Sequence, residues 1–296
     1  MNDSAVAERT ETTLKLAQVV GESAETTSEW MTAIWNNFDD GSRSLENYAD
    51  VLAKLGAATA SSADEIAGGL EKFAAVSETV GLSYEYAASA LATITAETRQ
   101  SEDVVGTALK TIFARIENLS LGETLEDGTT LGKYSEALAK VGVNIKDSNG
   151  NLKEMDDILD SIGMQWQVLN KDQQVALAQS VAGIRQYNQF MALMDNWDVM
   201  EKNVELAREA NGALEDQHEI WETGIEGATS RVKEELNEIK NKLLGENDLL
   251  PLLNIAEGFL DFVGDLVDSL GGLPGLLSII ASVGLKLWGP QAAAGL

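Results

Sequence analysis

Residues 62–94 read SADEIAGGLEKFAAVSETVGLSYEYAASALATI and decide the fold class. Ser62 and Glu65 have the spacing of a capping box, in which each side chain bonds a backbone N–H at the start of a helix. Apolar residues follow at helical spacing until Gly81, and Ser83 can cap a second helix with its own apolar face. The stretch therefore predicts two consecutive helices that are separated at Gly81.

The neighbouring sequence extends this pattern. Ser101, Glu102 and Asp103 predict the start of a third helix, because acidic residues are favourable at the positive end of the helix dipole. Its expected buried face comprises Val105, Ala108, Leu109, Ile112 and Ile116. The only prolines are at positions 251, 274 and 290, so about 250 residues lack the strongest helix breaker. We predict a nearly all-α protein with a multi-helix body.

One small β-hairpin is expected within that body. Residues 143–152 alternate apolar and polar side chains on both sides of Asn149-Gly150, the pattern of a hairpin turn. Asp147, Asn149 and Asn151 also match the first ligand positions of a calcium-binding loop. The required Gly and Glu are replaced by Leu152 and Ile158, which argues against calcium.

Tests for an enzyme find no complete set of catalytic residues. Gly128 and Gly132-Lys133 resemble a phosphate-binding loop, but the spacing is one residue short and Tyr134 replaces the Ser or Thr that binds magnesium. A loop that opens a helix at Thr130 is the simpler interpretation. Glu22-Ser23 is similar to the pair of lytic transglycosylases, but we expect it inside a polar helix. No catalytic, cofactor-binding or metal-binding residues are predicted.

The composition excludes several further classes of site. The 296 residues carry a formal net charge of −27, contain no Cys and have one His, His218. Zinc–thiolate sites, iron–sulfur clusters and disulfides all need cysteine, and specific binding to nucleic acid needs a basic face. We expect no cofactor and no specific nucleic acid partner.

The distribution of charge and apolar residues divides the chain into four expected regions. Residues 1–41 form a polar N-terminal helix and residues 42–200 form the helical body. Residues 201–248 form a long charged helix, and residues 249–296 form an apolar segment. The change is abrupt at Pro251, because residues 201–250 hold 13 acidic side chains and residues 251–296 hold four.

A heptad-like apolar seam runs along the long charged helix, with steps of three and four residues that are typical of a coiled coil. One pair of consecutive four-residue steps is a stutter, which relaxes the supercoil locally. The seam either packs back on residues 185–211 of the same chain or joins copies into a homo-oligomer. Its members are Leu214, His218, Trp221, Ile225, Ala228, Val232, Leu236, Ile239 and Leu243.

The C-terminal segment has the pattern of an apolar helical hairpin. An amphipathic stretch with Asp261, Asp265 and Asp268 on its polar face precedes residues 269–285, which are uncharged over 17 residues and lie at the short end of the range that spans a bilayer. The segment either contacts a membrane or is buried in an assembly. The candidate membrane residues are Leu273, Leu276, Leu277, Ile279, Ile280, Val283 and Leu285.

The order of these motifs resembles the core region of the tail tape measure proteins of long-tailed bacteriophages, over about residues 40–245. The resemblance rests on residues 62–94, on GTALKTIFARI at 106–116, on VGVNIKDSNGNL at 141–152, and on the block 169–194 that contains VAGIRQY. A coiled-coil helix and apolar segments follow in the order of that family.

This resemblance implies a structural protein of the virion that fills the tail lumen, sets tail length during assembly in the host cytoplasm and leaves ahead of the DNA. It implies tail tube proteins, tail tip proteins and assembly chaperones as partners, a homo-oligomer such as a trimer through the long helix, and contact with the host membrane on ejection. A single helix of 296 residues would reach about 440 Å, so we expect a fragment of a longer protein. The alternative function is a membrane-inserting, pore-forming or toxin-like helical protein.

Overall fold

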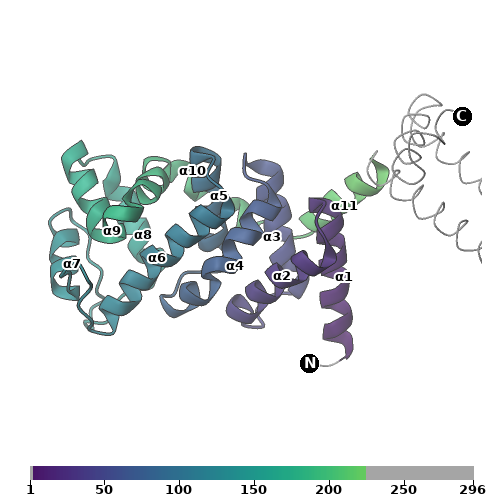
Figure 1. Ribbon diagram of the computed structural model, residues 1–296, viewed down its shortest axis with the longest axis horizontal. Coiled ribbons are helices and arrows are strands. Elements are labelled where there is room, and N and C mark those ends of the chain that lie inside the picture. The colour runs from purple at the N-terminus through teal and green to yellow at the C-terminus, as the bar shows by residue number, and fades with distance from the viewer. Residues whose placement is uncertain (1–2, 225–296) are drawn as a thin grey trace, which may run out of the picture. The chain divides into compact units, whose positions relative to one another are not determined.

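The computed structural model describes residues 3–224, and this range is nearly all helical. It contains eleven helices (Figure 1): α1 (Asp3–Val20), α2 (Ala24–Phe38), α3 (Leu45–Ala58), α4 (Ala63–Thr79), α5 (Tyr84–Thr98), α6 (Glu102–Ser120), α7 (Leu131–Ala139), α8 (Met155–Trp166), α9 (Lys171–Asp195), α10 (Trp197–Arg208) and α11 (Ala213–Thr223). The chain divides into two compact units, Met1–Glu215 and Asp216–Leu296. The fold of the first unit is therefore described by itself below.

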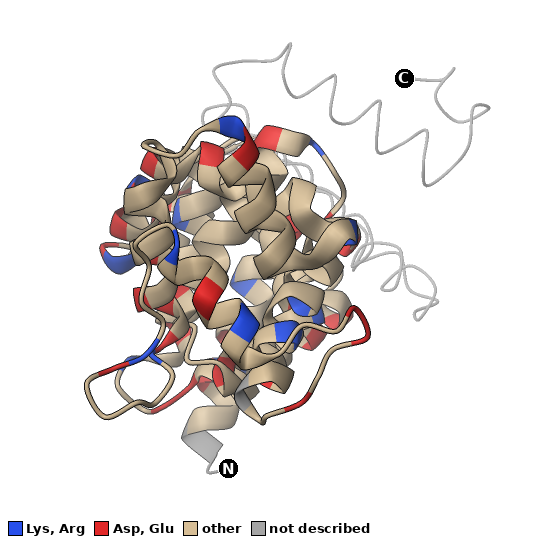
Figure 2. Ribbon diagram, turned by 90° about the vertical axis from the view of Figure 1, so that its left-hand side faces the viewer, with Lys and Arg blue, Asp and Glu red and all other residues tan. Residues whose placement is uncertain are grey.

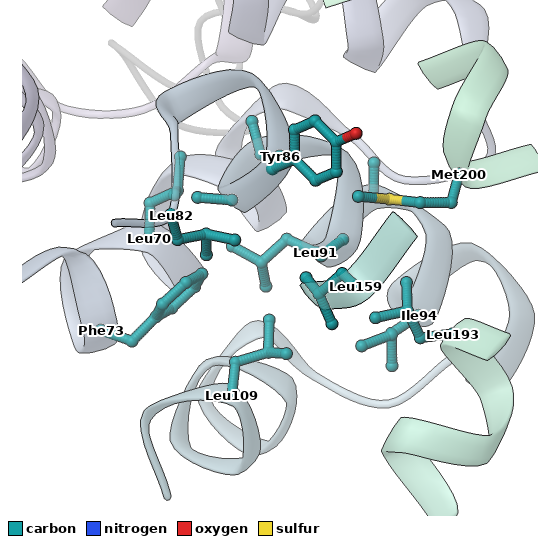
Figure 3. Close-up of a cluster of buried hydrophobic side chains, with 14 of the residues drawn as sticks. Leu70, Phe73, Leu82, Tyr86, Leu91, Ile94, Leu109, Leu159, Leu193 and Met200 are labelled. Atoms are coloured by element: carbon teal, nitrogen blue, oxygen red, sulfur yellow. The ribbon is translucent and has the colours of Figure 1, made fainter. Parts of the chain in front are cut away.

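Helix α5 forms the centre of the first unit. Every residue from Tyr84 to Thr95 is buried, and α3, α4, α6, α9 and α10 all pack against this helix. Figure 3 shows Leu91 and Ile94 of α5 surrounded by apolar side chains from its neighbours, which are Leu70, Phe73, Leu109, Leu159, Leu193 and Met200. Apart from Glu85, which pairs with Arg43 at 2.7 Å, the buried residues of α5 are apolar or small on all sides, and such a helix is stable only inside a core.

Glycines allow α4, α5 and α6 to approach one another closely. A Cβ atom added to Gly106 of α6 would lie 2.6 Å from the carbonyl oxygen of Gly69 in α4. One added to Gly69 would lie 2.5 Å from a methyl group of Leu91 in α5. The three helices therefore depend on two positions that have no side chain.

The helix starts predicted around residues 62–103 are confirmed. The Glu65 carboxylate accepts a hydrogen bond from the Ser62 N–H at 2.9 Å, and the Ser83 hydroxyl accepts one from the Tyr86 N–H at 3.4 Å. Gly81 takes a φ of +66° after α4, and Ser101 is the N-cap of α6. The predicted face of α6 is at most 1% exposed: Val105, Ala108, Leu109, Ile112 and Ile116.

The expectation of one N-terminal helix was wrong. Residues 3–38 form two helices, because Gly21 takes a φ of +75° and Ser23 caps α2 by accepting a hydrogen bond from the Thr26 N–H at 3.1 Å. Both helices pack against the body, α1 on α3 and α2 on α4. Ser23 is therefore a capping residue at the start of a helix.

The predicted β-hairpin is not present as a pair of strands. Residues 146 and 152 form one isolated antiparallel bridge, and no strand is present within residues 3–224. Gly150 has the positive φ expected of the turn. Two backbone hydrogen bonds flank this bridge, from the Asp147 N–H to the Asn151 carbonyl and from the Lys153 N–H to the Ile145 carbonyl, both at 2.9 Å, and α8 begins two residues later at Met155.

The expected long charged helix is interrupted at its start. Helix α10 ends at Arg208 and α11 begins at Ala213, with Gly212 at a φ of +76° between them. Three seam residues lie on α11, namely Leu214, His218 and Trp221. The other six seam residues and all seven candidate membrane residues lie outside the described part of the chain. Within that part, no helix combines the length and apolarity needed to cross a bilayer.

Replacement by alanine should have opposite effects on stability at two helical glycines, because only the first of them lies where α4 and α6 approach closely. Gly106→Ala should lower the free energy of unfolding by about 1–3 kcal/mol, because the new methyl group overpacks against the backbone of α4. Gly132→Ala in α7 is the matched control: its Cβ would have only one neighbour, at 3.9 Å, so it should stabilise by up to about 1 kcal/mol. Urea unfolding followed by circular dichroism measures both, and equal effects would contradict this account of the packing.

Candidate functional site

The strongest candidate site is the junction at which the chain leaves the body and enters α11. Asp50 on α3 is 5% exposed, and its carboxylate accepts hydrogen bonds from the backbone N–H of Gly212 at 3.0 Å and of Leu214 at 2.8 Å. Gly212 lies directly before α11 and Leu214 lies in its first turn, where N–H groups have no partner within the helix. A carboxylate at this end is also favoured by the helix dipole. Asp50 therefore acts as an N-cap that comes from another helix.

Further contacts attach the same turn to the body. The Asn47 side-chain amide donates a hydrogen bond to the Asn211 side-chain oxygen at 2.8 Å. Leu214 is fully buried in the hydrophobic core, with Ala210 and Ala213 also buried beside it. The first seam residue thus packs within its own chain.

A lysine with three acidic neighbours completes the junction. The Lys15 ammonium on α1 lies 2.7 Å from Glu215, 3.2 Å from Glu11 and 3.7 Å from Glu46. The hydrogen bond to Glu215 and the other carboxylates raise the pKa of Lys15 above its usual value. Because these groups are partly exposed, solvent screens their attraction and the cluster contributes little to the stability of the fold.

The other two described seam residues lie one turn apart on α11. The rings of His218 and Trp221 are stacked, with centroids 5.8 Å apart and planes 15° apart, and both residues are partly exposed. Leu214, His218 and Trp221 are the seam residues that lie within the described part of the chain.

A pocket of about 500 Å³ lies at a second place, between α6, the loop after it and the middle of α9. Arg115 and Arg185 line it, together with Asp127. The Arg115 guanidinium donates to Asp127 at 2.9 Å, and hydrogen bonding by Thr129 together with Arg115 lowers the pKa of Asp127 to about 2. Acidic and basic residues are interspersed on the side of the molecule that Figure 2 shows, which has no continuous basic face.

The motifs considered for phosphate and calcium binding have local structural roles. Thr130 caps α7 by accepting a hydrogen bond from the Lys133 N–H at 3.4 Å, as the sequence predicts. The Asp147 carboxylate accepts hydrogen bonds from the N–H groups of Asn149 and Asn151 at 2.8 and 2.9 Å. No group of three or more His, Cys, Asp or Glu side chains within residues 3–224 could hold a metal ion.

A family model described as phage-related minor tail protein matches residues 1–183, which is more than half of the chain. The chain belongs to this family. No solved structure matches it. Membership places this minor tail protein in the virion, gives it a structural role rather than suggesting an enzyme, and implies contacts with other tail components.

No pattern in the sequence predicts that Asp50 caps the start of α11. Asp50 and Leu214 are 164 residues apart, and an acidic residue inside a helix gives no sign of a distant partner. The one available signal is Gly212, because a glycine followed by apolar helical residues often marks the boundary of a helix.

Replacing Asp50 should release the first turn of α11. We expect Asp50→Ala to lower the free energy of unfolding by about 1–3 kcal/mol, because the buried N–H of Leu214 and the partly buried N–H of Gly212 lose their acceptor. Amide hydrogen exchange at Gly212 and Leu214 should become faster. Asp198→Ala is the control, because this exposed carboxylate contacts only Lys202 at 3.9 Å. Unchanged exchange at Leu214 in the folded variant would contradict the capping role.

Proposed function

We propose that this minor tail protein is part of a tail tape measure protein, in which an extended helical chain sets the length of the tail. The observation that carries the proposal is the continuation of a compact helical body into a helix whose seam has heptad spacing. The capped and buried first turn of α11 supports it, since this turn fixes where that helix starts. The family match supports a structural role in the tail.

The length of a helix suits a measuring function. Each helical residue adds about 1.5 Å, so the number of residues converts directly into a distance along the tail lumen. In this role the chain contacts tail tube and tail tip proteins, and assembly chaperones keep it soluble before the tube forms.

Self-association through the seam is the second part of the proposal. Because Leu214 packs within its own chain, contacts between copies begin beyond the junction, at His218 and Trp221, and continue along residues 225–243. A homo-oligomer such as a trimer pairs these positions inside a tube with cyclic symmetry. The coiled-coil pattern supports this arrangement.

The charge supports release ahead of the genome. A chain with a net charge of −27 is repelled by the phosphate backbone, so it does not adhere to DNA that follows it through the lumen. The uncharged residues 269–285 then support contact with the host membrane at the end of ejection. A membrane-inserting, pore-forming activity is the competing proposal, and it rests on this same segment.

Tail length tests the measuring function. Inserting four heptads, 28 residues, into the phage gene after the codon for Leu243 should lengthen the tail by about 42 Å. A substitution of 28 existing codons in the same gene, with no change in length, is the control. Electron microscopy of the virions gives the tail lengths, and complete tails of unchanged length would overturn the tape measure proposal.

Sedimentation tests whether copies of the chain associate through the seam. We expect the full chain to be oligomeric at tens of micromolar, and Ile225→Asp with Val232→Asp to dissociate it, because two charges enter an apolar interface. Thr223→Asp with Ser230→Asp adds the same charge away from the seam and should leave the oligomer intact. A monomeric wild-type chain would contradict self-association and favour packing within one chain.

A further inference from the structure

Helix α9 contains a break that only glycine tolerates. Between Lys171 and Asp195 a single residue, Gly183, has non-helical angles, with φ +73° and ψ 168°. This combination of φ and ψ is sterically excluded for residues that carry a Cβ atom. The break therefore divides α9 into two segments, 171–182 and 184–195.

The two segments bury faces that do not align along one straight helix. The first segment buries Leu177, Ala178, Val181 and Ala182. In a continuous helix this stripe would pass through positions 185 and 188, which are an exposed arginine and an exposed asparagine. The second segment instead buries Phe190, Leu193 and Met194. Only a break allows both apolar faces to reach the core.

Arg115 of α6 occupies the space beside the break. A Cβ atom on Gly183 would lie 3.1 Å from Nη1 of Arg115, so the guanidinium packs directly on the glycine backbone. The Asp127 carboxylate pairs with the same guanidinium through Nη2 at 2.9 Å. The pocket of about 500 Å³ leaves open space around Ala182–Gln186, and Ile184 is 77% exposed.

We propose that Gly183 is a hinge, that Arg115 and Asp127 hold α9 in its bent form, and that α9 straightens into one continuous helix when the body extends. The extension of the body rests on the proposed function, whereas the hinge is a property of the chain alone and can be tested in the isolated protein. In the straight form one apolar stripe of α9 leaves the core and becomes available to a helix of another copy. The hinge thus converts a buried face into a contact surface.

Distance measurements between two spin labels test the hinge. The chain has no cysteine, so Asp172→Cys and Asn188→Cys, both at exposed positions, provide two unique attachment sites in the full chain. A continuous helix separates the two Cα atoms by about 24 Å, and a bend brings them closer. We expect the labelled parent chain to give one distance shorter than this value.

Gly183→Ala should shift most of the distribution to about 24 Å, because alanine is excluded from the bent conformation and favours the helix. Gly122→Ala is the matched control: Gly122 also has a positive φ, +85°, with nothing within 4 Å of its Cβ position, and should leave the distance unchanged. A folded Gly183→Ala protein that keeps the short distance would overturn the proposal.

A second variant decides the case in which Gly183→Ala unfolds the protein. Arg115→Gln removes the guanidinium and leaves the glycine in place, so a population at about 24 Å is expected beside the short distance. An unchanged short distance in this variant would also overturn the hinge. Tail length in the insertion phages tests the proposed function separately, so the two proposals can fail independently.

Discussion

The burial of α5 on every side is the constraint on which the rest of the first unit depends. A helix that exposes no face must be surrounded, and α3, α4, α6, α9 and α10 surround it. The small residues that make this possible, Ala87, Ala88 and Ala90, leave little side chain between helix axes. Gly69 and Gly106 serve the same purpose between α4 and α6. Close approach of backbones therefore replaces large side chains in much of this core.

The sequence predicts local features of this fold well. Helix starts at Ser62, Ser83 and Ser101 depend on residues within four positions of each other, and the buried face of α6 depends only on periodicity. Two of the failures concern glycine. Gly21 follows the end of α1 and Gly212 precedes the start of α11, and the apolar spacing on both sides does not reveal either break.

The candidate site was less predictable than the fold. The seam residues follow from spacing, and the first of them, Leu214, is an apolar residue on a helix as expected. Its burial within its own chain and the role of Asp50 depend on contacts between residues 164 positions apart. The same holds for Arg115 and Gly183, which neither a motif nor a period connects. Long-range contacts of this kind follow from the packing of whole helices around α5.

The bond between Asp50 and the first turn of α11 has a mechanical consequence. It closes a loop of 164 residues, so tension along the chain passes from α3 to α11 through a few hydrogen bonds and the side chain of Leu214, without loading the helices between them. While this contact holds, the intervening polypeptide does not lengthen the chain under tension. Fully extended, these 164 residues would span roughly 550 Å, and the packing of α10 on α3 and α5 holds them folded together with this contact. The cap is therefore one of the few contacts that directly join the two ends of this long segment.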